Sequence, residues 1–175
     1  MTKHKPKIII VGAGLSGLTL ALSLAQSNFD IVVLEQASQL SEVGAGIQIS
    51  ANGARVLHLL GLESELAKVA FRPEQGEMRH WKTGETLISR PLGKTSVERF
   101  GFPYYHMHRY DFHRLLETAT RAAAPNAIRL QASVDTIKQN DRGVSAVLTS
   151  GDVIEGDVLI GCDGIHSVVR ETLFG

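Results

Sequence analysis

Residues 8–18 read Ile8-Ile9-Ile10-Val11-Gly12-Ala13-Gly14-Leu15-Ser16-Gly17-Leu18. An apolar run of β-branched residues meets a turn with three spaced glycines, and an Ala- and Leu-rich segment continues to residue 25. This order predicts a buried strand, a tight loop and a helix over residues 15–25. It is also the context in which Gly-x-Gly-x-x-Gly is typical of a dinucleotide-binding turn.

The three glycines of this turn have different expected roles. Gly12 permits the sharp turn, Gly14 lets the backbone approach a diphosphate, and Gly17 lets the helix pack closely on the strand. The free N–H groups and the positive dipole end of the helix then face the phosphates. For Ser16, at the start of the helix, we predict a phosphate contact, with helix capping as the alternative.

A second apolar run, at residues 31–34, ends in Glu35, about 20 residues after the glycine turn. A carboxylate at the tip of this strand accepts both hydroxyls of an adenosine ribose and repels a 2′-phosphate. The pattern therefore predicts an adenine dinucleotide and disfavours NADP at this position. The simpler alternative is a glycine-rich turn without a ligand, with Glu35 as a solvated strand end.

Composition excludes several classes of protein. A chain of 175 residues with zero formal net charge predicts one domain, with no nucleic-acid partner and no attraction to an anionic membrane. The helix at 15–25 is too short to span a bilayer, and the glycines that interrupt the first apolar run argue against a signal peptide. The single cysteine, Cys162, has no internal disulfide partner and is expected to be a small buried residue. Together these features favour a cytoplasmic protein.

A polar connection over residues 37–50 becomes glycine-rich before the chain resumes a helical pattern. Gly44 and Gly46 allow the backbone to pass close to a flat ligand, or simply to turn. Asn52 is the predicted N-cap of the next helix, and Gly61 fits its C-cap.

The helical period disappears between residues 73 and 103, where two runs around Thr83-Gly84-Glu85 predict a β-hairpin. We assign residues 73–108 to an excursion from the main sheet on the substrate side. The last strand is continuously apolar, as expected for a strand covered on both faces. The other expected elements are helices at 52–60, 62–69, 110–124 and 168–173, strands at 128–130 and 158–162, and an antiparallel meander at 134–139, 144–148 and 153–155. The predicted fold class is α/β: a doubly wound, Rossmann-like domain with a meander and a partial small β-sheet.

Three separate stretches resemble the FAD-dependent aromatic hydroxylases, the single-component flavoprotein monooxygenases that include salicylate and hydroxybenzoate hydroxylases. The first stretch is the glycine turn with Glu35. The second, at residues 44–53, is similar to the family's loop beside the flavin. The third, at 156–170, contains Asp163-Gly164 followed by Ser167 and Arg170, and resembles a fingerprint tied in the family to both FAD and NAD(P)H.

The resemblance implies a set of FAD contacts. Arg109 matches the family's flavin-contacting arginine, with a surface salt bridge as the alternative. Val134 would contact adenine through its backbone. Asp163 would hold a water at the ribityl chain or the diphosphate, or else cap an Asp-Gly turn. Arg170 fits an ion pair that closes its own loop better than a cofactor contact. The implied contacts are Gly12, Ala13, Gly14, Leu15, Ser16, Gly17, Glu35, Gln36, Ala45, Gly46, Ile47, Arg109, Val134, Asp163 and Gly164.

The resemblance also implies a reaction. NAD(P)H would reduce FAD, and the reduced flavin would use O₂ to hydroxylate a small aromatic acid. The cofactor would carry out the redox chemistry. No side chain here fits a general base, so the catalytic residues stay unassigned. His106, His108 and His113 lack the spacing of metal ligands and fit packing or a ligand-facing aromatic strand.

The family's third fingerprint normally lies beyond position 175, so the resemblance is to the N-terminal portion of a hydroxylase, with the family fold incomplete at the C-terminus. Three alternatives follow: a fragment, a split enzyme that needs a second polypeptide, or a short relative without the reaction. The hairpin and the incomplete sheet are expected to expose apolar surface, which a second polypeptide or a homo-oligomer would cover.

Two rival functions remain open at this point. One is a non-catalytic or partner-requiring module that binds FAD through its ADP end. The other is an NAD-dependent dehydrogenase, which has no reason to carry the stretch at 156–170.

Overall fold

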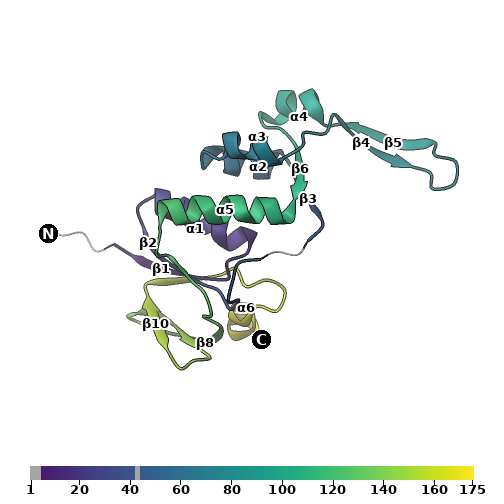
Figure 1. Cartoon of the computed structure of the whole chain (residues 1–175). Coiled ribbons are helices and arrows are strands. Elements are labelled where there is room, and N and C mark those ends of the chain that lie inside the picture. The colour runs from purple at the N-terminus through teal and green to yellow at the C-terminus, as the bar shows by residue number, and fades with distance from the viewer. Residues whose placement is uncertain (1–4, 42–43) are drawn as a thin grey trace. The chain divides into compact units, whose positions relative to one another are not determined.

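The computed structural model describes residues 5–41 and 44–175 and divides into two compact units (Figure 1). The first unit combines Met1–Ser41 with His113–Gly175, and the second is Glu42–Phe112. The first therefore holds the glycine turn, and the second holds the predicted hairpin.

A parallel sheet forms the base of the first unit. Its strands are β1 (Lys7–Val11), β2 (Asp30–Leu34), β7 (Ile128–Arg129) and β11 (Val158–Gly161). They pair in the order β11-β1-β2-β7, and helix α1 (Leu15–Gln26) connects β1 to β2. Ile9, Ile10 and Val33 are completely buried. The strand, turn and helix predicted from residues 8–25 are therefore confirmed, and so is the α/β fold class.

The predicted antiparallel meander packs against this sheet. Its strands are β8 (Val134–Asn140), β9 (Gly143–Leu148) and β10 (Val153–Gly156), in the order β10-β9-β8. Side chains of β8 and β9 share one apolar cluster with Ile9, Val11 and Leu34. Val169 of helix α6 (Val168–Phe174) completes this cluster.

The expectation that the last strand is covered on both faces is wrong. Strand β11 lies at the edge of the parallel sheet, and Val158 is 46% exposed. Cys162, which follows the strand, is half-buried rather than fully buried. Its partial burial raises the pKa of the thiol, and the neighbouring Asp163 carboxylate raises it further. The thiol therefore stays protonated and poorly reactive at neutral pH.

The second unit contains two small antiparallel sheets and three helices. Strand β3 (Gly46–Ile49) pairs with β6 (Tyr105–His108), and β4 (Gln75–Arg79) pairs with β5 (Thr86–Pro91). The helices are α2 (Ala51–Leu59), α3 (Glu63–Val69) and α4 (Gly93–Phe100). The predicted hairpin is thus confirmed as a two-stranded ribbon (Figure 1). Helix α5 (Arg109–Ala123) follows β6, close to the expected bounds.

The start of α2 differs from the prediction, whereas its end agrees with it. Ser50 is the N-cap, and Asn52 lies inside the first turn, where it accepts a hydrogen bond from the Ser50 hydroxyl (2.5 Å). At the other end, the Gly61 N–H donates to the His58 carbonyl and the next N–H donates to that of Leu57. This is a Schellman ending, which the positive φ of Gly61 (78°) makes possible.

Helix α4 was not expected from the sequence. Its apolar residues Val97 and Phe100 are both exposed, so no buried apolar stripe marks it as a helix. The start and the end of the helix are instead determined by specific backbone features. The Glu74 carbonyl accepts the N–H groups of residues 92 and 93, and Gly101 ends the helix with a φ of 77°.

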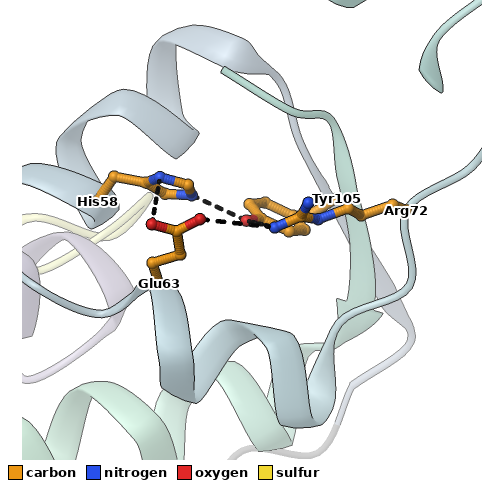
Figure 2. Close-up of polar contacts among 4 residues, drawn as sticks. All are labelled: His58, Glu63, Arg72 and Tyr105. Atoms are coloured by element: carbon orange, nitrogen blue, oxygen red, sulfur yellow. Dashed lines mark hydrogen bonds and ion pairs between the residues drawn. The ribbon is translucent and has the colours of Figure 1, made fainter. Parts of the chain in front are cut away.

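A polar cluster surrounds the hydroxyl of the buried Tyr105 in the second unit (Figure 2). Tyr105 of β6 is 0% exposed, and its hydroxyl lies 2.8 Å from His58 Nε2. Arg72 Nη2 donates to the same hydroxyl (3.1 Å), and the guanidinium also lies over the Tyr105 ring. The Glu63 carboxylate faces both partners of the hydroxyl, at 3.6 Å from His58 Nδ1 and 3.9 Å from Arg72 Nη2. The cluster therefore links α2 and α3 to β6.

None of the helices in the described part of the chain is both long enough and apolar enough to cross a lipid bilayer.

We expect the Tyr105→Phe variant to lose about 1–3 kcal/mol of unfolding free energy, because the part-buried ring nitrogen of His58 and the Arg72 guanidinium lose their shared partner. The control is Tyr104→Phe, whose hydroxyl donates to Gln48 Oε1 in an exposed position. We expect a change within about 0.5 kcal/mol for the control. Urea unfolding of both variants measures the difference, and equal losses would contradict a structural role for the Figure 2 cluster.

Candidate dinucleotide site

Close backbone contacts fix the glycine turn of the first unit. Gly12 has a φ of 99°, and a Cβ there would lie 2.5 Å from the Cys162 carbonyl oxygen. A Cβ at Gly17 would overlap with the carbonyl oxygen of Gly12. The conformational roles predicted for Gly12 and Gly17 are therefore confirmed. The Gly12 N–H also donates to the Leu34 carbonyl (2.7 Å), which ties the turn to β2.

Gly14 is different from the other two glycines. It is the N-cap of α1, with an ordinary φ of −70°, and apart from its chain neighbours no described residue places an atom within 4 Å of a Cβ built on it. Within residues 5–41 and 44–175, no packing contact therefore requires a glycine at this position. The open space lies beside the first turn of α1, where the N–H groups of Leu15, Ser16 and Gly17 have no partner within the helix. This is the geometry that an approaching diphosphate needs.

Glu35 turns its carboxylate toward the same loop. Its Oε2 accepts the Ala13 N–H (2.8 Å), and its Oε1 accepts the Ala37 N–H (2.9 Å). Each oxygen keeps a further lone pair, so the carboxylate can still accept ribose hydroxyls. Gln36, the next residue, is exposed.

The segment before β8 lies beside the Glu35 backbone. The Glu35 N–H donates to the Arg129 carbonyl (2.9 Å), and the Glu35 carbonyl accepts the Ala132 N–H (2.8 Å). Val134 follows at the start of β8 and shares an apolar cluster with Leu34. The structure therefore brings Val134 near the acid that was predicted to bind ribose; its contact with adenine stays a prediction.

The loop after β11 is closed by its own polar groups. Asp163 accepts the Ser167 hydroxyl (2.6 Å) and the Val169 N–H (3.2 Å), so its carboxylate caps the start of α6. Arg170 donates to the Ile165 carbonyl (2.8 Å), which closes the loop by a hydrogen bond to backbone instead of the expected ion pair. The water-holding role of Asp163, and that of the exposed Gly164 beside it, stay predictions.

Ser16 lies in the first turn of α1 and is exposed. The N-cap is Gly14, and no side chain makes the capping hydrogen bond, so the capping alternative for Ser16 is wrong.

In the second unit, four predicted residues are neighbours. The Arg109 N–H donates to the Ala45 carbonyl (3.3 Å), next to the start of β3 at Gly46. The Arg109 side chain also packs over Gly44, where a Cβ would lie 3.0 Å from its Cδ. The half-buried Ile47 pairs with Met107 in the adjoining strand. Gly44 therefore makes room for the arginine side chain within this unit.

A cleft of about 380 Å³ also lies in the second unit, and none of the predicted site residues lines it. Its walls combine charged and apolar side chains, among them Arg72, Glu74, Lys94, Glu98, Val97 and Tyr104. Within residues 5–41 and 44–175, no group of three or more His, Cys, Asp or Glu side chains is placed to hold a metal ion.

Sequence reasoning missed the contact that His113 makes with the glycine turn. His113 is buried on α5, and its Nε2 donates to the Ala13 carbonyl (2.8 Å). The available signal was the spacing of His113, Leu116 and Thr120, which places all three on one helix face.

The FAD binding domain family matches residues 5–174. The chain belongs to this family. It is 39% identical over 175 residues to a 3-amino-4-hydroxybenzoate 2-monooxygenase of Streptomyces platensis, a match that covers 100% of this chain and 43% of that protein. It is also 38% identical over 174 residues to the 6-hydroxynicotinate 3-monooxygenase of Pseudomonas fluorescens, covering 98% of this chain and 44% of that protein.

Solved structures of flavoprotein oxygenases share the fold. The tetrameric form of 2-methyl-3-hydroxypyridine-5-carboxylic acid oxygenase matches with a TM-score of 0.83 and 27% identity, over 97% of this chain and 42% of that one. Klebsiella pneumoniae HpxO complexed with FAD and uric acid matches with a TM-score of 0.81 and 27% identity, over 97% and 42% of the two chains.

These relatives support the resemblance to aromatic hydroxylases over the NAD-dependent dehydrogenase. The chain spans about 43% of the length of the curated relatives it matches.

Proposed function

We propose that this chain binds FAD through its ADP moiety at the glycine turn and forms the FAD-binding part of an NAD(P)H-dependent monooxygenase. In this proposal, the diphosphate lies at the first turn of α1 and the Glu35 carboxylate accepts the ribose hydroxyls. Val134 contacts adenine, and Asp163 and Gly164 lie near the ribityl chain or the diphosphate. The contacts that the resemblance implies for residues 45–47 and Arg109, in the second unit, stay predictions.

The observation that carries this proposal is the open space at Gly14. Its backbone conformation suits any residue, and no atom of the described part of the chain, its sequence neighbours aside, lies within 4 Å of the place its side chain would occupy. A glycine that the fold does not need is explained by a ligand that approaches the backbone closely. Membership of the FAD binding domain family supports FAD as that ligand.

The electrostatics of the first unit support the same orientation of the ligand. The N-terminus of α1 carries about half a positive elementary charge, which favours the diphosphate. Glu35 carries a negative charge next to the loop, which favours neutral ribose hydroxyls and disfavours a 2′-phosphate. FAD has both a diphosphate and an unphosphorylated adenosine ribose.

The proposed substrate is a small aromatic acid, because the relatives named above are monooxygenases of 3-amino-4-hydroxybenzoate and 6-hydroxynicotinate. Bound FAD would supply the redox chemistry, with NAD(P)H as the electron donor. The residues of this chain would bind and orient the cofactor, and no general base is assigned among them. The cytoplasm is the proposed location, in keeping with a single cysteine that cannot form an internal disulfide.

A partner-requiring module is the second candidate, favoured by the exposed hairpin. Trp81 is 88% exposed, and Met78, Leu87 and Ile88 on β4 and β5 are exposed as well. A two-stranded ribbon with this many exposed apolar side chains is marginal alone. A second polypeptide or a second copy of the chain would cover it, and one similar structure is described as a tetrameric form.

We expect the freshly purified chain to show a flavin absorption spectrum after addition of FAD and gel filtration.

The Gly14→Ala variant should keep the unfolding free energy of the wild type within about 1 kcal/mol. Its FAD affinity should fall at least about tenfold, because the new methyl group lies where the diphosphate approaches.

Gly17→Ala is the contrasting variant. Overlap with the Gly12 carbonyl should cost it about 1–3 kcal/mol of stability. If Gly14→Ala binds FAD as well as the wild type does, the diphosphate does not lie at this turn.

Sedimentation velocity tests the partner-requiring alternative. Self-association that rises with protein concentration is expected if a second copy covers the hairpin. Trp81→Ser should reduce it, because it removes the most exposed aromatic side chain of the ribbon. A monomer at all concentrations would exclude self-association as the way in which the hairpin is covered.

A further inference from the structure

His113, a core residue of the first unit, forms a hydrogen bond with the glycine turn. It is 3% exposed on α5, and its Nε2 lies 2.8 Å from the carbonyl oxygen of Ala13. A carbonyl oxygen can only accept, so Nε2 carries the hydrogen and donates it. Ala13 lies between Gly12 and Gly14 of the glycine turn, which places this hydrogen bond at the proposed dinucleotide site.

Both backbone polar groups of Ala13, its N–H and its carbonyl, form a hydrogen bond with a side chain. Its N–H donates to Glu35 Oε2 (2.8 Å), and its carbonyl accepts from His113. Ala13 is itself 1% exposed, so water is not available to replace either partner. Two side chains from different elements therefore fix the backbone of one loop residue.

The carbonyl of Ala13 and the N–H of Gly14 belong to the same peptide group. No cis peptide bond occurs among the described residues, so the C=O and N–H of this trans unit point in opposite directions. With the oxygen turned toward His113, the Gly14 N–H is turned away from it. Gly14 is the N-cap of α1, beside the open space described above.

We propose that His113 is a positioning residue for the bound dinucleotide. By holding the Ala13 carbonyl, it keeps the Gly14 N–H aimed at the diphosphate, so that this amide is ready to donate before the ligand arrives. Without the His113 donor, the peptide between Ala13 and Gly14 loses the hydrogen bond that orients its carbonyl, and ligand binding must fix that orientation instead. The inference rests on the proposed function, because it assigns His113 to the ADP end of FAD.

The same helix face provides a matched control. Thr120 is 0% exposed on α5, and its hydroxyl donates to the Leu18 carbonyl (3.2 Å) within α1. Both side chains therefore dock α5 through a hydrogen bond to a backbone carbonyl. The Thr120 acceptor lies inside a regular helix, whereas the His113 acceptor lies in the glycine turn. A purely structural role would make the two residues alike in their effect on ligand affinity.

The experiment measures the affinities of FAD and ADP for the full chain by titration calorimetry, with urea unfolding of each variant. His113→Phe keeps a planar ring without the donor, and we expect it to weaken FAD and ADP by the same factor, about tenfold. His113→Gln places an amide donor near the position of Nε2 and should recover the wild-type affinities within about threefold. Thr120→Val should lose stability and keep both affinities.

Several results would overturn the inference. His113→Phe with wild-type affinities would do so, and so would an equal loss of affinity in Thr120→Val. If His113→Phe does not fold, His113→Asn takes its place: its shorter amide does not reach Ala13, so it should bind weakly where His113→Gln binds well. Equal affinities of the Asn and Gln variants would contradict the inference. A wild-type chain that binds neither FAD nor ADP would refute the proposed function itself.

Discussion

The carbonyl oxygen of Gly12 occupies the place where a side chain at residue 17 would have to go. This contact sets the distance between the end of β1 and the first turn of α1. Because the two are so close, the N-terminus of α1 opens directly next to β1, and Glu35 at the end of the adjacent strand reaches the loop between them. The ADP site proposed here depends on this short distance.

The parts of the fold with local signals could be predicted from the sequence. The apolar run at 8–11 and the three glycines that follow it each specify their structure through neighbouring residues. Helix α4 could not be predicted, because its apolar residues face solvent and its start is fixed by the carbonyl of Glu74, distant in sequence. The N-cap of α2 shows the same limit, since both Ser50 and Asn52 suit that position.

The residues of the candidate site also divide into those that the sequence predicted and those that it did not. Gly12, Gly17 and Glu35 followed from spacing along one βαβ unit. His113 lies 100 residues from Ala13 along the chain, and no local pattern connects them. The Asp163 loop was ambiguous, because the same carboxylate can cap a helix or hold a ligand-bound water. In the structure it caps α6 and retains lone pairs for a second partner.

The most direct test of the central claim is a titration of the ¹⁵N-labelled chain with ADP, followed by its backbone amide resonances. ADP carries the diphosphate and the ribose without the flavin, so it tests the glycine turn alone. We expect the largest shifts at the amides of Gly14, Leu15 and Ser16, and we expect a 2′-phosphorylated ADP to bind at least about tenfold more weakly. Saturable binding that leaves these three amides unshifted would contradict the central claim.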